Sequence, residues 1–194
     1  MSSSLTAAPS DVQGSDARFN TIPSLDGAPP LVTVRHLTKT YRGRPALRDL
    51  SLSLPAGRIV GLMGANGCGK TTLLKILAGV LADYEGQVRV AGHAPGPLSK
   101  ALVSFLPDAD FLATSLTPPR AIAQFSRLFA DFDAAKARRL VDFFALPAER
   151  SIKEMSKGMG EKLRIALMMS RRARVYLLDE PISGVDPAAR EIIL

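Results

Sequence analysis

Residues 64–71 read Gly-Ala-Asn-Gly-Cys-Gly-Lys-Thr and fit the Gly-x4-Gly-Lys-Thr pattern of a phosphate-binding loop. The apolar run Ile59–Met63 precedes this segment, and a helix-like run over Thr71–Val80 follows it. The three glycines allow backbone N–H groups to surround closely spaced phosphate oxygens. Lys70 adds a positive charge at the start of that helix, and the hydroxyl of Thr71 suits a Mg²⁺ ion. This context favours nucleoside triphosphate binding over a glycine-rich turn that only packs a helix on a strand.

Two carboxylates, Asp179 and Glu180, follow the apolar run Arg174–Leu178, which predicts a short strand. Parallel sheets bind their ligands at the carboxyl ends of the strands, so this position suits catalysis. Asp179 would hold the hydration shell of a Mg²⁺ ion, and Glu180 would polarise a water that attacks the γ-phosphate. An acidic start of the next helix is the alternative, and the phosphate-binding loop favours the catalytic interpretation.

The segment Met155–Met159 lies between these two motifs and reads Met-Ser-Lys-Gly-Met, before a helix-like run over Glu161–Arg172. Ser156 and the N–H group of Gly158 would form an anion site at a helix N-terminus. The pattern resembles the Leu-Ser-Gly-Gly-Gln signature of ATP-binding cassette (ABC) ATPases, in which the serine and the second glycine agree. An ordinary serine N-cap also explains Ser156, and we expect both roles together.

The resemblance implies an α/β fold: a P-loop NTPase core with an N-terminal antiparallel β-subdomain and a helical insertion subdomain at about residues 115–172. It also implies that Ser156 and Gly158 meet the γ-phosphate of an ATP held by a second ATPase subunit, in a head-to-tail dimer. Separate transmembrane permease subunits complete such transporters, so the expected location is cytoplasmic and peripheral, on the inner face of the cell membrane. The Ser-Lys-Gly-Met form is similar to cassettes of bacterial export-type transporters.

Further positions match family landmarks or depart from them. Tyr41 stands where ABC cassettes place an aromatic side chain that stacks on adenine, although a surface-packed tyrosine is the alternative. Asp108, after the predicted strand Leu102–Leu106, stands where the family usually carries a glutamine that contacts Mg²⁺ and the attacking water. A turn residue after Pro107 is its other interpretation. The loop Ser183–Asp186 resembles the segment that touches the partner subunit.

The predicted site therefore combines residues from all these motifs, with ATP and Mg²⁺ as the implied cofactors. The catalytic residues are Glu180 and Lys70, and the metal-binding residues are Thr71, Asp179 and Asp108. The nucleotide-binding residues are Tyr41, Gly64, Ala65, Asn66, Gly67, Cys68, Gly69, Lys70, Thr71, Thr72, Ser156 and Gly158.

Composition agrees with this assignment. The chain has 194 residues and a net charge of +7, with its 25 basic residues scattered, so we expect no nucleic-acid partner. One cysteine, Cys68, excludes a disulfide framework, and no apolar run approaches the roughly 18 residues that span a bilayer. Residues 1–30, rich in Ser, Ala, Pro and Asp, predict a disordered tail before a domain over 31–194.

Apolar periodicity predicts the elements that position these residues. The strands are Leu31–Arg35, Leu50–Leu54, Arg58–Met63, Gln87–Ala91, Leu102–Leu106 and Arg174–Leu178. Thr117 and Asp133 are expected to cap two helices of the insertion. His36 and His93 are expected at the surface.

The family also carries a switch histidine and a further central strand beyond the motifs present in this chain. We therefore expect the domain to be incomplete after Leu194, with Arg174–Leu178 and Ile59–Met63 facing a gap at the sheet centre and with reduced stability and ATPase activity. The alternatives to a transporter ATPase are an ATP-binding module without turnover and an ABC ATPase outside transport.

Overall fold

The computed structural model describes residues 3–5, 20–21 and 29–180 of the chain. The chain divides into two compact units, residues 1–102 and 103–194. Among the described residues, no helix combines the length and apolar character needed to cross a membrane.

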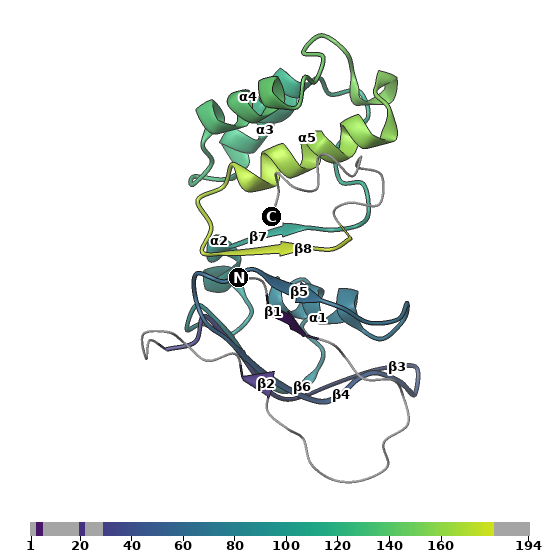
Figure 1. Cartoon of the computed structure of the whole chain (residues 1–194), viewed down its shortest axis with the longest axis vertical. Helices are drawn as coiled ribbons and strands as arrows, with labels where there is room; N and C mark the ends of the chain where they lie inside the picture. Colours follow the sequence, from purple (N-terminus) through teal and green to yellow (C-terminus); the bar gives the residue numbers. More distant parts are fainter. Residues whose placement is uncertain (1–2, 6–19, 22–28, 181–194) are drawn as a thin grey trace. The chain divides into compact units, whose positions relative to one another are not determined.

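The first unit contains a four-stranded sheet in the order β2-β4-β3-β6 (Figure 1). Strand β3 covers Val32–Tyr41, β4 covers Arg44–Leu54 and β6 covers Glu85–Val90. Both β4 and β6 run antiparallel to β3, which confirms the antiparallel β-subdomain. The β3–β4 hairpin turns through two residues with positive φ, as a two-residue hairpin of type I′ requires.

The same unit carries the strand and helix on either side of the phosphate-binding loop. Strand β5 covers Val60–Leu62, and helix α1 covers Lys70–Leu77 with its buried face packed into the core. The short helix α2, Pro97–Leu102, was not predicted, because six residues are too few to reveal a helical period. His36 and His93 are exposed, as predicted.

Two short strands lie in the segment where composition predicts a disordered tail. Strand β1, Ser3–Leu5, pairs in parallel with β5, and strand β2, Asn20–Thr21, pairs in parallel with β4. The edges of β5 and β4 offer these five residues backbone partners that composition does not reveal, and the disordered tail over residues 1–30 stays a prediction. Strand β1 pairs with one edge of β5, and the expected gap between Ile59–Met63 and Arg174–Leu178 stays a prediction.

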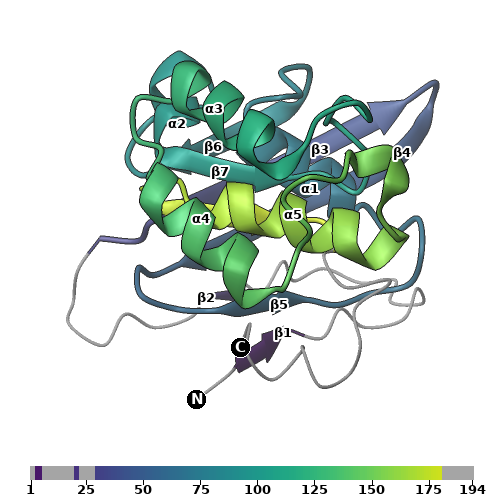
Figure 2. The ribbon, with the colours of Figure 1, turned by 90° about the horizontal axis from the view of Figure 1, so that it is seen from above.

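The second unit packs three helices on a pair of parallel strands. Strands β7, Val103–Leu106, and β8, Val175–Leu178, pair in register. Helices α3, Pro118–Leu128, α4, Ala134–Phe143, and α5, Lys157–Met169, form the helical part of this unit. Figures 1 and 2 show α4 alongside α5, and Figure 1 shows α5 next to the strands. The core between them includes Phe125, Leu163 and Leu167.

The helix starts follow from the capping residues. Thr117 and Asp133 are the N-cap residues of α3 and α4, as predicted, and the Asp133 carboxylate accepts a 2.8 Å bond from the Lys136 N–H. Helix α5 starts at Lys157 rather than at Glu161, because Ser156 is its N-cap. The single 3₁₀ turn η1, Ile152–Glu154, precedes it and was not predicted.

Arg171 joins the α3–α4 connection to the strand pair. Its guanidinium is bonded to the Asp131 carboxylate at 3.1 Å and to the Val103 carbonyl at 2.8 Å. The guanidinium also lies 4.3 Å from the centre of the Phe129 ring. This buried charge is therefore satisfied by an ion pair, a carbonyl and a ring face, which together hold the helices against β7.

Candidate functional site

The phosphate-binding loop connects β5 to α1 in the first unit, and its shape depends on Gly69. This residue has a φ of +97°, a conformation that residues with a Cβ rarely adopt. A Cβ added there would collide with the Ala46 carbonyl oxygen and lie 2.8 Å from Leu47 Cδ2. Glycine is therefore required at this position by both the backbone conformation and the space available.

Lys70, the first residue of α1, extends over the loop. Its Nζ donates hydrogen bonds to the carbonyls of Gly64 at 2.9 Å and Ala65 at 3.1 Å, and lies 4.0 Å from Cys68 Sγ. The N-cap of α1 is Gly69, which has no side chain to bond the first-turn amides. The loop thus presents a positive charge and helix N–H groups together, which is the arrangement that binds phosphate.

Tyr41 ends β3 and is exposed. It pairs across the hairpin with Arg44, two residues before the Ala46 carbonyl that Gly69 approaches. The Lys39 ammonium lies 4.8 Å from the centre of the Tyr41 ring and is paired with Asp83 at 2.7 Å. The end of the hairpin is thereby close in the fold to the phosphate-binding loop, although the adenine-stacking role of Tyr41 stays a prediction.

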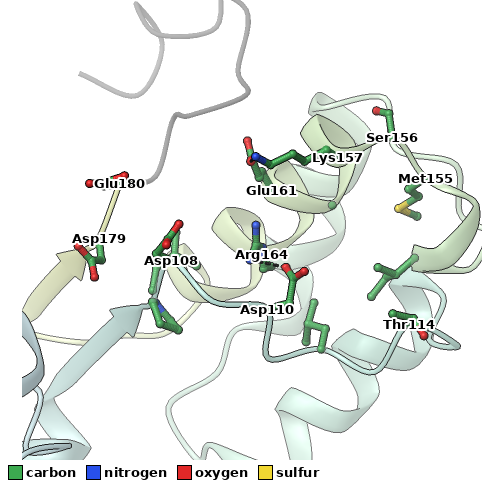
Figure 3. Close-up of a pocket in the computed structure, with 15 residues that line it drawn as sticks. Asp108, Asp110, Thr114, Met155, Ser156, Lys157, Glu161, Arg164, Asp179 and Glu180 are labelled. Atoms are coloured by element: carbon green, nitrogen blue, oxygen red, sulfur yellow. Dashed lines mark ion pairs between the residues drawn. The ribbon is translucent and has the colours of Figure 1, made fainter. Parts of the chain in front are cut away.

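In the second unit, the predicted acidic residues gather at the carboxyl ends of β7 and β8 (Figure 3). Leu106 is paired with Leu178, and the Asp179 N–H donates a 2.9 Å bond to the Leu106 carbonyl. Asp108 and Glu180 are therefore each the second residue after the last paired position of their strand. Asp179 is buried, whereas Glu180 is exposed and has a φ of +48°. Such backbone strain is frequent at functional sites.

These residues line a pocket of about 370 Å³. Its ionisable side chains are the carboxylates Asp108, Asp110, Glu161, Asp179 and Glu180 and the cations Lys157 and Arg164. Lys157 lies 3.8 Å from Glu161, and Arg164 lies 2.6 Å from Asp110. The excess of carboxylates gives this pocket a negative potential, which attracts a cation rather than a phosphate. The residues of the phosphate-binding loop are not among those that line this pocket, and their binding of phosphate stays a prediction.

The pocket residue Ser156 is the N-cap of α5, and its hydroxyl accepts a 3.3 Å bond from the Met159 N–H. The predicted N-cap role is thereby confirmed. The turn in front of it is braced by Ser151 and Glu154, because the Glu154 carboxylate accepts bonds from the Ser151 N–H at 2.8 Å and hydroxyl at 2.6 Å. These bonds, the one from the hydroxyl first, lower the pKa of Glu154 below its ordinary value.

The donor set fits a Mg²⁺ ion that arrives with a nucleotide. Asp108 and Asp179 offer the carboxylate oxygens that Mg²⁺ prefers. Within the part of the chain that the structure describes, no group of three or more His, Cys, Asp or Glu side chains could hold a metal alone. Mg²⁺ commonly combines one or two carboxylates with phosphate oxygens and waters, which agrees with this small protein contribution.

The structure brings some of the predicted site residues together and adds others. Asp108, Ser156, Asp179 and Glu180 line one pocket, and the loop residues from Gly64 to Thr72 are contiguous in the other unit. The predicted contact loop Ser183–Asp186 lies outside the described residues. Sequence reasoning missed Asp110, Glu161 and Arg164 as pocket residues.

The sequence also held a signal for the turn in front of α5, which was not predicted. Ser151 and Glu154 form a Ser-x-x-Glu capping box, which is readable from sequence. Glu161 and Arg164 are three residues apart on one helix face, but no sequence rule pairs Arg164 with Asp110.

Comparison with known proteins identifies the family of this chain. The family model described as ABC transporter matches residues 47–183, more than half of the chain. The chain therefore belongs to the ABC transporter family.

Two curated relatives illustrate the range of the family. The chain is 32% identical over 176 residues to the Nod factor export ATP-binding protein I of Ralstonia nicotianae, covering 86% of this chain and 54% of that protein. It is 33% identical over 174 residues to the spermidine/putrescine import ATP-binding protein PotA of Legionella pneumophila, covering 84% and 46%. The chain thus spans about half the length of these relatives, whose names include both export and import.

The fold is shared with solved structures. An ATP-binding subunit of an ABC transporter superposes with a TM-score of 0.73 at 26% identity, covering 83% of this chain and 70% of that one. The predicted α/β class, with its N-terminal antiparallel sheet and helical part, is confirmed.

Proposed function

We propose that this protein binds Mg-ATP and hydrolyses it as the ATP-binding subunit of an ABC transporter. The observation that carries the proposal is the position of Lys70, whose ammonium lies over the loop carbonyls beside an uncapped helix N-terminus. Asp179 and Glu180, at the end of β8, supply the carboxylates that hydrolysis needs.

Each residue has a distinct role in the proposed reaction. The loop amides and Lys70 bind the β- and γ-phosphates, and the Thr71 hydroxyl and the carboxylates of Asp179 and Asp108 would hold Mg²⁺. When bound, Mg²⁺ neutralises charge that develops on the phosphate oxygens. Glu180 accepts a proton from the water that attacks the γ-phosphorus in line with the leaving oxygen.

The proposed partners follow from the family. A second ATPase subunit would place its Ser156 and Gly158 against the γ-phosphate, and separate permease subunits would hold the pair at the inner face of the membrane. We propose export as the direction, on the Ser-Lys-Gly-Met form of residues 156–159 and the similarity to the Nod factor export protein. Reconstitution with the permease that co-purifies from membranes would test it, and uptake into cells would contradict export.

The variant Lys70→Ala tests nucleotide binding directly. Loss of a charge-assisted contact worth about 1.5 to 3 kcal/mol should weaken Mg-ATP binding by about 10- to 150-fold in a calorimetric titration. Lys75→Ala, which removes the same charge in the last turn of α1, is the matched control and should bind Mg-ATP as the wild type does. Equal affinity of Lys70→Ala and wild type would remove Lys70 from the site, and wild-type binding without turnover would favour a regulatory module.

A further inference from the structure

The segment that carries Asp108 is held at several points within the second unit. Before Asp108, the Leu106 carbonyl accepts a bond from the Asp179 N–H at 2.9 Å. After it, the carbonyls of Thr114 and Leu116 accept 2.9 Å bonds from Lys153 and Ile152 N–H groups. The residues between these anchors form a loop, in which Leu112 packs against the helical core and the Phe111 ring lies 6.2 Å from the Phe125 ring.

Arg164 supplies a constraint in the middle of this loop. Its side chain is 12% exposed and lies 2.6 Å from the Asp110 carboxylate. Figure 3 shows this ion pair between Arg164 on α5 and Asp110. Asp110 is two residues after Asp108, and Leu106 is two residues before it. Asp108 is therefore centred between one backbone anchor, the bond from Asp179 directly after β8, and one side-chain anchor, Arg164 on α5.

We propose that the Arg164–Asp110 ion pair is a positioning pair, which holds the Asp108 carboxylate where it can bind the Mg²⁺ of Mg-ATP. The inference rests on the proposed function, because it assigns a task to Asp108 only if Mg-ATP binds. Neither Arg164 nor Asp110 touches nucleotide or metal in this proposal. Their contribution is to link the Asp108 loop to the helix that begins with Ser156.

The charge balance of the pocket supports this role. Arg164 is nearly buried among several carboxylates, so its positive charge could otherwise draw Asp108 away from a metal. Pairing with Asp110, which is 87% exposed, neutralises Arg164 and leaves the Asp108 carboxylate as a metal ligand. Substitution of either partner should therefore weaken metal binding more than it weakens binding of the nucleotide without metal.

The experiment measures the dissociation constant of ATP with EDTA and with Mg²⁺. The ratio of the first constant to the second is the Mg²⁺-dependent gain in affinity. Asp110→Asn and Arg164→Met should each lower the Mg²⁺-dependent gain by about two- to fivefold, the effect of a surface-linked ion pair, and leave the affinity in EDTA unchanged. The double variant should lower this gain no further than the more strongly affected single variant does, because both substitutions break the same ion pair. Asp108→Asn, the reference, should lower the same ratio.

The controls separate positioning from a general loss of structure. Asp142→Asn makes the same charge change at an exposed site on α4 and should leave the ratio at its wild-type value. Amide hydrogen exchange over residues 107–113 without nucleotide should become faster in Asp110→Asn, which is expected to fold because Asp110 is exposed. Should Arg164→Met fail to fold, Asp110→Asn gives the decision by itself.

Several outcomes would overturn the inference. An unchanged ratio in folded Asp110→Asn would do so, as would an equal loss of affinity with and without Mg²⁺. A lowered ratio in Asp110→Asn but not in Asp108→Asn would show that the pair does not act through Asp108. A wild type that binds no ATP would instead refute the proposed function, and the inference with it.

Discussion

Gly69 shows at the scale of one residue how the loop sequence is constrained. Its positive φ would cost a residue with a Cβ about 1 to 2 kcal/mol, and the approach of the Ala46 carbonyl adds a collision that only a backbone shift relieves. By contrast, Gly57 also has a positive φ, but a Cβ added there meets no atom within 4 Å. The two positions therefore separate the cost of conformation from the cost of crowding.

We expect Gly69→Ala to destabilise the domain more than Gly57→Ala does. Both variants carry the strain of about 1 to 2 kcal/mol, and Gly69→Ala adds the displacement of the β4 backbone or of the loop. Chemical denaturation of each variant against wild type measures the difference. Equal destabilisation of the two variants would mean that the Ala46 carbonyl does not restrict the loop.

At the scale of secondary-structure elements, the start of α5 depends on a small network of hydrogen bonds in the turn before it. The capping box of Ser151 and Glu154 closes η1, and Met155 then leads directly to the N-cap Ser156. The geometry of the predicted signature is therefore set by a turn in front of it as well as by the serine itself. Because the pKa of Glu154 is lowered in the folded protein, the ionised carboxylate stabilises this turn.

A lowered pKa gives a definite dependence on pH. The stabilisation is complete above the unfolded-state pKa of Glu, about 4.3, and is lost as the pH falls through the lower folded-state pKa. Glu154→Gln should therefore melt at a lower temperature than wild type at about pH 7, with the difference shrinking at about pH 3.

The matched control for this prediction is Glu149→Gln, an exposed position in the same connecting segment. It should show a smaller difference from wild type at neutral pH. A constant gap between Glu154→Gln and wild type at both pH values would contradict the role of the ionised Glu154 carboxylate.

At the scale of the whole molecule, the proposed activity depends on residues from both units and on a second subunit. The negative pocket of the second unit suits a cation, and the loop of the first unit suits phosphate, so neither alone suits the complete Mg-ATP. In the function proposed above, a second subunit completes the nucleotide site through its Ser156. Removal of the proposed general base should therefore trap the dimer by preventing hydrolysis.

We expect Glu180→Gln to bind ATP, to lose most hydrolysis and to accumulate as an ATP-bound dimer on size exclusion. The amide keeps the size of the side chain but cannot accept the proton of the attacking water. Adding Lys70→Ala to this variant should abolish the dimer, because ATP no longer binds tightly. Persistent turnover, or a monomer at saturating ATP, would contradict the role of Glu180 as base.

The sequence by itself determined the phosphate-binding loop, the acidic strand end and the caps Thr117, Asp133 and Ser156. Each of these depends on residues within a few positions of one another, where glycine conformation, strand periodicity and capping chemistry act locally. The family followed from the same local motifs because their order along the chain is itself specific.

Only the tertiary structure decided the contacts between distant segments. The pairing of Arg164 with Asp110, of Arg171 with Asp131 and of β1 with β5 joins residues far apart in the sequence. An arginine and an aspartate have many possible partners by charge alone, and an open strand edge accepts almost any extended backbone. Which partner is chosen depends on the packing of α5 and the strands, and no local pattern encodes that choice.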